Sequence, residues 1–290
     1  MKKAALLALI LLSVSVSGLF ALPADLQSEL SAKYEKQVLM LRHPVWSNSQ
    51  KYDAAGNLIG HADPEPWTTH GGVEITKIRL AGDRLELEGT RCIYGYNPKQ
   101  KTMLPVQLKD KTKVKVQIAL PTPLSTMAEA DAAIDRVFTR NDEELIDSVP
   151  DYWRPFLKTL HARAGKPDDE PAAKQKMVDL PTPREAAAGK EVAPMKIDGK
   201  LVKAPRARFT PEPSFTELAR NKLRAEGVVV LSVIIDREGK VQRPIIIRPI
   251  GGGLDEQAIE TVKLWKFDPA TKDGKPVAVE MAIEVAFNLY

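Results

Sequence analysis

The stretch that decides the fold of this chain is residues 227–267, GVVVLSVIIDREGKVQRPIIIRPIGGGLDEQAIETVKLWKF. The β-branched run Val228–Ile235 predicts a strand, Asp236–Gly239 is typical of a tight turn, and Lys240–Arg248 predicts the return strand. Pro244 has no backbone donor, so the return strand should lie at a sheet edge or carry a bulge. These residues predict an antiparallel hairpin.

A helix and a last strand follow the hairpin. The helix should begin at Leu254, because Gly251–Gly253 read as a flexible turn and because the carboxylates of Asp255 and Glu256 favour a helix N-terminus. Its apolar face comprises Leu254, Ala258, Val262 and Trp265, and we expect Trp265 in the core. The last strand alternates, with one apolar side: Val277, Val279, Met281, Ile283, Val285 and Phe287. Glu280, Glu284 and Asn288 should face the other side.

A further helix is predicted before the hairpin. Ser214-Phe-Thr-Glu217 has the spacing of a capping box, in which the hydroxyl and the carboxylate satisfy free amides at a helix start. Gly227 should end this helix. Residues 209–290 are therefore expected to fold as a small α+β domain, with an antiparallel sheet and two helices.

Residues 22–163 predict a separate β-rich N-terminal domain with a helical tail. A polar helix is expected over Ala24–Glu35, and the alternating run Gly72–Leu80 predicts a hairpin with the residues after Arg84. In the tail, Met127, Ala130, Ile134 and Phe138 share one helical face, and a second helix should run from Asp142 to Leu160 with bends at Pro150 and Pro155. Residues 164–208 are rich in Pro, Lys and Glu and predict an unstructured linker.

The N-terminus carries a leader over residues 1–21. Lys2 and Lys3 precede the apolar run Ala4–Leu22, which is the layout of a secretory signal peptide. The same run just reaches the roughly 20 residues that a membrane-spanning helix needs, so an uncleaved inner-membrane anchor is the alternative. In both cases the bulk of the chain is exported, because the lysines hold the N-terminus inside.

Composition and charge exclude several classes of protein. Of the 290 residues, 43% are hydrophobic and the net charge is only +4 with scattered Lys and Arg, which argues against nucleic-acid binding. Cys92 is the only cysteine, so no intramolecular disulfide forms, and a buried apolar role on a strand is expected for it.

The ordered Gly, Trp and Pro spacing of the C-terminal part resembles the C-terminal domain of TonB proteins. The matching residues are Pro213, Phe215, Ala219, Gly227, Val229, Asp236, Gly239, Val241, Leu254, Asp255, Ala258, Trp265, Phe267, Pro269, Ala270, Asp273, Gly274, Pro276 and Val277. The β-rich part, with Trp67-Thr68 and the spacing of Leu85, Gly89 and Arg91, is similar to the N-terminal halves of some bacterial TonB-family proteins.

The resemblance implies partner binding. TonB proteins use an ExbB–ExbD motor of the inner membrane to open outer-membrane TonB-dependent transporters, and their C-terminal domain grips an extended transporter segment by strand addition. The pairing strand would comprise Met281, Ala282, Ile283, Glu284, Val285, Ala286 and Phe287, and Glu212, Pro213 and Ser214 would also touch the transporter. Energy-transducing members carry a histidine in the membrane span, and Ala4–Leu22 has none. A non-energised periplasmic adaptor that uses the same domain is therefore the alternative.

Candidate sites for chemistry are weak. The four histidines, His43, His61, His70 and His161, lack metal-ligand spacing, although a site from His61, Asp63 and His70 is conceivable. Gly251–Gly253 lacks the Lys-Ser/Thr of a phosphate-binding loop. The sequence thus predicts no catalytic residue, no metal site and no cofactor, and an enzyme with its site in the β-rich part is only a third alternative.

Overall fold

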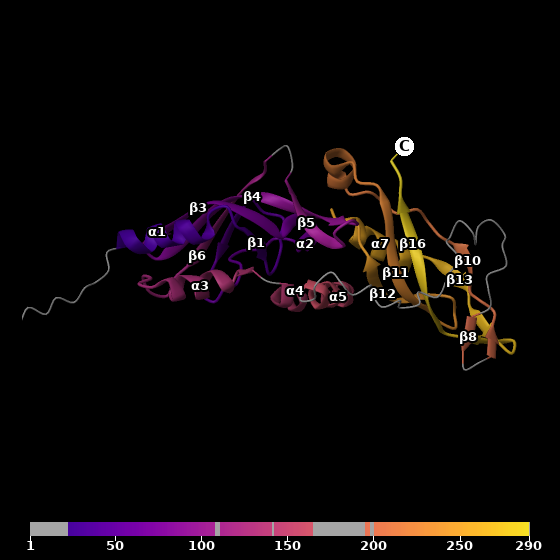
Figure 1. Cartoon of the computed structure of the whole chain (residues 1–290). Helices are drawn as coiled ribbons and strands as arrows, with labels where there is room; N and C mark the ends of the chain where they lie inside the picture. The colour runs from indigo at the N-terminus through magenta and orange to yellow at the C-terminus, as the bar shows by residue number, and fades with distance from the viewer. Residues whose placement is uncertain (1–22, 108–110, 141, 165–194, 198–199, 290) are drawn as a thin grey trace, which may run out of the picture.

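The computed structural model describes residues 23–107, 111–140, 142–164, 195–197 and 200–289. The leader, including the proposed anchor at residues 4–22, lies outside this range. Among the helices of the described residues, none combines the length and the apolar character needed to cross a bilayer. An N-terminal unit and a C-terminal unit lie side by side along the long axis of the molecule (Figure 1).

The N-terminal unit is built on a 7-stranded sheet in the order β2-β6-β4-β3-β1-β7, with β5 paired to β4. The predicted hairpin is present: β3 pairs antiparallel with β4, and a turn at Gly82 and Asp83 joins them. The pairs of this sheet are antiparallel except for β2, which runs parallel to β6. The strands are β1 (Val38–Leu41), β2 (Ser49–Tyr52), β3 (Gly72–Ala81), β4 (Arg84–Asn97), β5 (Thr102–Gln107), β6 (Lys113–Ala119) and β7 (Phe138–Thr139).

Helices α1 (Pro23–Tyr34) and α3 (Met127–Asp135) share a core with this sheet. The α1 residue Tyr34 is buried, and its hydroxyl donates to Asp131 of α3 at 2.6 Å. Cys92 is 1% exposed, and burial raises the pKa of its thiol, as expected of an apolar core residue. The predicted helix over 142–160 is divided into α4 (Asp142–Ser148) and α5 (Arg154–Ala164), which Pro150 separates.

The C-terminal unit contains the three-stranded sheet β12-β11-β16. The predicted hairpin is formed by β11 (Gly227–Ile235) and β12 (Val241–Arg248). As Pro244 indicated, β12 is an edge strand with register shifts, and Arg243 beside the proline has a positive φ of 46°. The apolar face of α7 (Leu254–Lys263) belongs to one core with β11 and with the inward-facing residues of β16 (Val279–Phe287), which are Val279, Ile283, Val285 and Phe287.

The helix predicted from Ser214 is shorter and begins later than expected. It is a π-helical segment over Leu218–Leu223, and the Thr216 hydroxyl, rather than Ser214, accepts the N–H of Ala219 at 3.0 Å. Arg224, in the left-handed conformation, ends it instead of Gly227. The Thr216 hydroxyl also donates to the carbonyl of Gly252 at 3.2 Å. This contact with the glycine turn positions Thr216 as the cap, so the capping-box pattern at Ser214 was misleading.

Part of the expected linker is structured. Residues 195–209 contain the short strands β8 (Met195–Ile197), β9 (Lys200–Val202) and β10 (Arg206–Phe209). β10 pairs with β13 (Lys266–Asp268), and Lys203 bridges Thr271 in β14 (Ala270–Lys272), which pairs with β15 (Lys275–Val277). β8 and β9 pair with each other. The prediction failed for β10 and Lys203 because their partners lie about 60 positions away, which local composition does not reveal.

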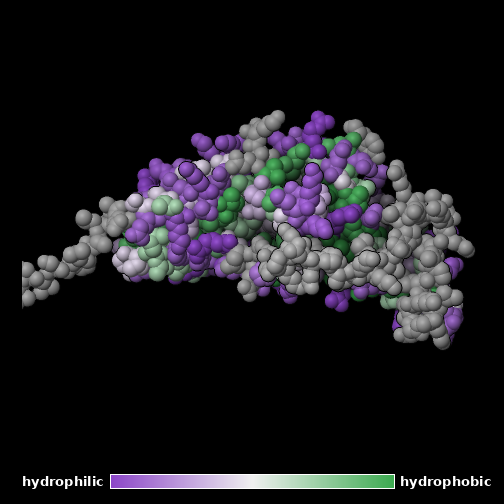
Figure 2. All heavy atoms as spheres, in the orientation of Figure 1, coloured by the Kyte–Doolittle hydropathy of each residue, from purple (hydrophilic) through white to green (hydrophobic). Residues whose placement is uncertain are grey.

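The two units pack against each other through a shared core, and the N-terminal sheet has a second core of its own with α1 and α3. Two backbone hydrogen bonds join β4 to the glycine turn, from Tyr96 N to Ile250 O at 2.8 Å and from Gly252 N to Tyr94 O at 3.1 Å. Around them lies an aromatic cluster: Trp67, Tyr94, Tyr96, Trp153 and Phe156. Figure 2 shows apolar residues gathered in the middle of the molecule, where the units meet.

Candidate functional site

The C-terminal sheet has two edges with different surroundings. At one edge, the N–H of Ile246 in β12 donates to the carbonyl of Tyr152 at 2.9 Å, and helix α5 packs beside β12. At the other edge, β16 pairs with β11 over its whole length, from Val279 opposite Ile235 to Phe287 opposite Gly227. Within the described residues, no strand pairs with the far side of β16. β16 therefore offers backbone N–H and C=O groups to an incoming strand.

The predicted docking residues Met281–Phe287 all lie in β16. Ile283, Val285 and Phe287 are buried in the core to which α7 also contributes, in agreement with the predicted apolar side. Ala286 is exposed, and Ala282 and Glu284 are half-buried on the opposite face. The strand is thus anchored through one face and keeps its edge and its other face available.

The second predicted segment lies near the end of this strand. Glu212 and Ser214 are exposed, and Pro213 is half-buried. Contacts on either side hold the segment: the Trp265 indole donates to the Pro211 carbonyl at 3.1 Å, and the Phe215 ring packs edge-on against Phe287 at 5.3 Å. Trp265, predicted as core, is half-buried just beyond the end of α7. The fold therefore brings the two predicted segments together at Phe287.

The glycine turn does not form an anion site. Gly251, Gly252 and Gly253 have φ values of 94°, 63° and 80°, which favour glycine. The Asp255 carboxylate accepts the N–H of Ile250 at 2.8 Å and of Gly251 at 2.7 Å, so an acid already occupies the N-terminus of α7. The turn was expected to be flexible, but its backbone hydrogen bonds to Tyr94 and Tyr96 join the two units.

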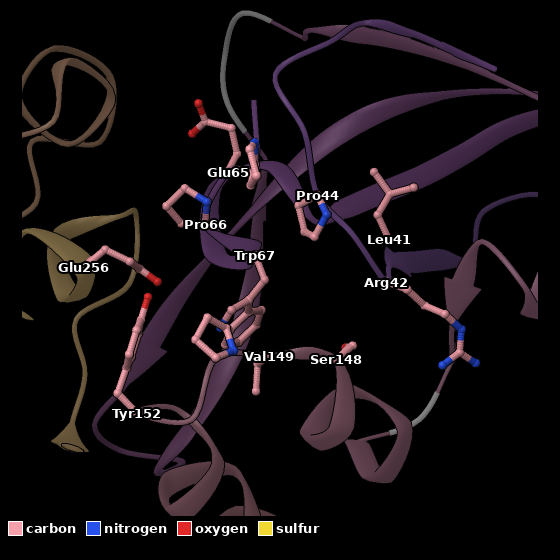
Figure 3. Close-up of a pocket in the computed structure, with 12 residues that line it drawn as sticks. Leu41, Arg42, Pro44, Glu65, Pro66, Trp67, Ser148, Val149, Tyr152 and Glu256 are labelled. Carbon is pink, nitrogen blue, oxygen red and sulfur yellow. The ribbon is translucent and has the colours of Figure 1, made fainter. Parts of the chain in front are cut away.

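A cavity of about 290 Å³ lies at the joint between the units, and Figure 3 shows its lining. Trp67 and Val149 form its apolar wall, and the side chains of Tyr152 and Glu256 point toward one another across one end. Arg42 at the other end is neutralised by Glu144 at 2.5 Å. The lining holds no nucleophile beside a base, so the cavity has the character of a packing defect between the units rather than of a catalytic site.

The histidines do not meet in a metal site. His61 and Asp63 are exposed, with 3.9 Å between His61 Nε2 and Asp63 Oδ1. His70 is buried 2.8 Å from the Thr69 hydroxyl, and burial together with the Arg91 charge lowers the pKa of His70 to about 4. In the described part of the chain, no three His, Cys, Asp or Glu side chains are grouped as metal ligands require.

The carboxyl groups of Asp255 and Glu256 should make the free energy of unfolding depend on pH. Burial raises the pKa of both carboxyl groups, and the charge of Glu256 adds to the rise at Asp255. Glu256 Oε1 accepts the Trp153 N–H at 2.8 Å, but its buried Oε2 has no partner among the described residues. Since the folded-state pKa values lie above the unfolded values of about 4, the neutral forms stabilise the fold at low pH and this contribution is lost as pH rises.

We expect the parent chain to lose more unfolding free energy than Glu256→Gln between about pH 5 and pH 8.5, because the variant keeps the acceptor for Trp153 but cannot ionise. Urea denaturation at the two pH values measures the difference. Glu260→Gln is the matched control, since Glu260 is exposed on the same helix. An equal loss in the parent and in Glu256→Gln would contradict the assignment.

Comparison with known proteins assigns the C-terminal unit. Residues 211–289 match the family described as Gram-negative bacterial TonB protein C-terminal. Residues 211–289 are a TonB C-terminal domain. The resemblance predicted from the sequence is thereby confirmed for this part of the chain, and the TonB family is non-enzymatic, as predicted.

Two known proteins match the C-terminal part of the chain. Protein TonB of Vibrio cholerae serotype O1 is 34% identical over 79 residues, which are 27% of this chain and 32% of that protein. The chain therefore spans about a third of the length of this curated relative. The solution NMR structure of the Pseudomonas aeruginosa TonB CTD is matched over 29% of this chain and 86% of that chain, at 19% identity and a TM-score of 0.24, a likeness too weak to add to the assignment.

Proposed function

We propose that this chain is an exported cell-envelope protein whose TonB C-terminal domain binds a partner by strand addition at β16, in TonB-dependent transport across the outer membrane. The observation that carries the proposal is the asymmetry of the sheet in the described part of the chain: β12 is covered by α5 and by the Tyr152 carbonyl, which accepts the Ile246 N–H, whereas β16 is paired with a strand on one side only. The partner would be an extended segment of an outer-membrane TonB-dependent transporter.

Strand addition suits this edge for a physical reason. An incoming strand satisfies its own backbone N–H and C=O groups and those of β16 at once, which gives affinity without a deep pocket. β16 is held rigid for this purpose, because nine residue pairs connect it to β11 without a register shift. Pre-organisation of the edge lowers the entropic cost of binding.

A non-energised periplasmic adaptor is the second candidate, and one observation favours it. The N-terminal sheet and the TonB domain share a core that includes Trp67, Trp153 and Leu231, so the domain is fixed to a second folded unit. Sequencing of the mature N-terminus from the envelope separates the candidates. A start near Leu22 would remove coupling to a membrane motor, and retention of residues 1–21 with cross-linking to an ExbB-like protein would remove the adaptor.

The docking edge can be tested by photo-cross-linking in the envelope. A photoreactive amino acid in place of Ala286, which is exposed on β16, should cross-link to an outer-membrane transporter. The same group in place of Glu238, exposed in the turn between β11 and β12, is the control and should not. Equal cross-linking from both positions, or none from Ala286, would overturn the assignment of the edge.

Replacing Ile283 by proline should abolish capture of this partner, because proline removes a backbone donor and distorts the strand at the centre of the edge. Pull-down by the full chain measures the effect, with circular dichroism to verify the fold. Ile283→Val keeps the N–H and the burial of this side chain and should bind as the parent does. Normal capture by a folded Ile283→Pro variant would discard strand addition.

A further inference from the structure

The face of β16 that points away from α7 carries two carboxylates. Ile283, Val285 and Phe287 lie in the core with α7, so the alternate residues of the strand lie on the opposite face. These are Glu280, Ala282, Glu284 and Ala286. Four residues of strand place the two glutamates about 13 Å apart on one line along the open edge.

Neither carboxylate is neutralised by a cation within the described residues. Glu280 accepts the Ser232 hydroxyl at 2.6 Å, which leaves its charge in place. Glu284 makes no ion pair or hydrogen bond in the part of the chain that the structure describes. Arg243 lies across a cavity of about 140 Å³ that Glu280 also lines, and no ion pair joins the two.

Charge is distributed unevenly across this face of the sheet. Arg243 and Arg248 belong to β12, at the edge that Tyr152 closes, whereas the acids belong to β16, at the edge that is open. The whole chain has a net charge of +4, so the acidic open edge is a local feature and not a consequence of an acidic protein.

We propose that the segment that pairs with β16 is cationic, with Lys or Arg at two positions four residues apart on the face away from α7. This inference rests on the strand-addition function proposed above and specifies its partner. Residues directly opposite on neighbouring strands have Cβ atoms about 5 Å apart, so two cations would meet Glu280 and Glu284, and two acids would be repelled. The small side chains of Ala282 and Ala286 leave room for long side chains between them.

The same charges disfavour a second copy of this chain as the occupant. Pairing of β16 with another β16 would bring two more carboxylates to the same face, and like charges on facing strands are destabilising. Acidic side chains on an edge strand are a common device against self-association. A partner strand that carries Lys or Arg would be attracted to the same two carboxylates.

The test uses the full chain and three acetylated octapeptides, Val-X-Val-Thr-Val-X-Val-Thr, with X as Lys, Gln or Glu, in fluorescence anisotropy at low salt. The Lys peptide should bind roughly fivefold tighter than the Gln peptide and more than tenfold tighter than the Glu peptide. In about 0.5 M salt the three affinities should converge. The double variant Glu280→Lys/Glu284→Lys should reverse the order of the Lys and Glu peptides.

The matched control is Glu238→Lys/Glu260→Lys, which changes the net charge equally at exposed positions away from β16 and should keep the parent order. Equal binding of all three peptides, or the parent order in the Glu280→Lys/Glu284→Lys variant, would overturn the cationic partner and leave strand addition standing. No binding of any peptide would count against strand addition itself. A dimer of the parent that Ile283→Pro dissociates would assign the edge to a second copy and overturn the proposal.

Discussion

Trp153→Ala is expected to lower the free energy of unfolding by about 3–5 kcal/mol, the range for truncation of a buried aromatic residue. Trp153 is fully buried, its ring meets Trp67 edge-on at 5.2 Å, and its N–H is the hydrogen-bond donor to Glu256. The variant would leave a cavity and an acceptor without its partner at the joint between the units. Urea denaturation, followed by circular dichroism, measures the loss.

Trp46→Ala is the matched control for Trp153→Ala. Trp46 is 69% exposed, and its ring packs against that of His70 with the centroids 4.9 Å apart. Its removal should change stability by less than about 1 kcal/mol. If both variants lose the same small amount, the shared core is not a cooperative element of the fold.

Gly251→Ala should destabilise the chain by roughly 3 kcal/mol, the second large effect. An added Cβ would lie 2.2 Å from the carbonyl oxygen of Tyr94, and the φ of 94° is unfavourable for an L-residue by about 1–2 kcal/mol. Since the clash is with backbone, β4 must move away, and the two hydrogen bonds that join the units at Tyr94 and Tyr96 would weaken.

Gly274→Ala is the control that separates the backbone cost of a positive φ from the steric clash of an added Cβ. Gly274 has a φ of 75°, but an added Cβ there meets nothing within 4 Å, so only the backbone cost of about 1–2 kcal/mol should be seen. Differential scanning calorimetry of both variants gives the comparison. Equal losses would show that the approach of Gly251 to Tyr94 contributes nothing to stability.

Local patterns predicted much of the C-terminal domain correctly. The β-branched run before Asp236 and the alternation through Ile283 fix strands because side chains on successive residues must face opposite sides of a sheet. The prediction of a capping box at Ser214 was wrong because short polar side chains compete for the same amides. Thr216, whose hydroxyl is held by the Gly252 carbonyl, accepts the Ala219 N–H instead.

Strand pairing between distant residues could not be predicted from the sequence. Residues 195–208 were expected to be part of a linker, but residues 206–209 form β10, whose partners are supplied by β13. The contacts of Trp153 and Gly251 between the units could not be predicted either. A tryptophan or a glycine turn has the same local sequence whether its contacts lie near or far along the chain.

The sequence by itself determined the strands β11, β12 and β16, the alternating face of Met281–Phe287 and the TonB resemblance, because these depend on side-chain periodicity and on conformations that Gly and Pro favour. The short strands β13, β14 and β15 were not predicted, and Val277 of the expected last strand lies in β15. The tertiary structure alone decided which edge of the sheet is open. That depends on the hydrogen bond between the Ile246 N–H and the Tyr152 carbonyl and on aromatic packing between the units. These contacts join residues far apart along the chain, and nothing in the local sequence indicates that they are close in space.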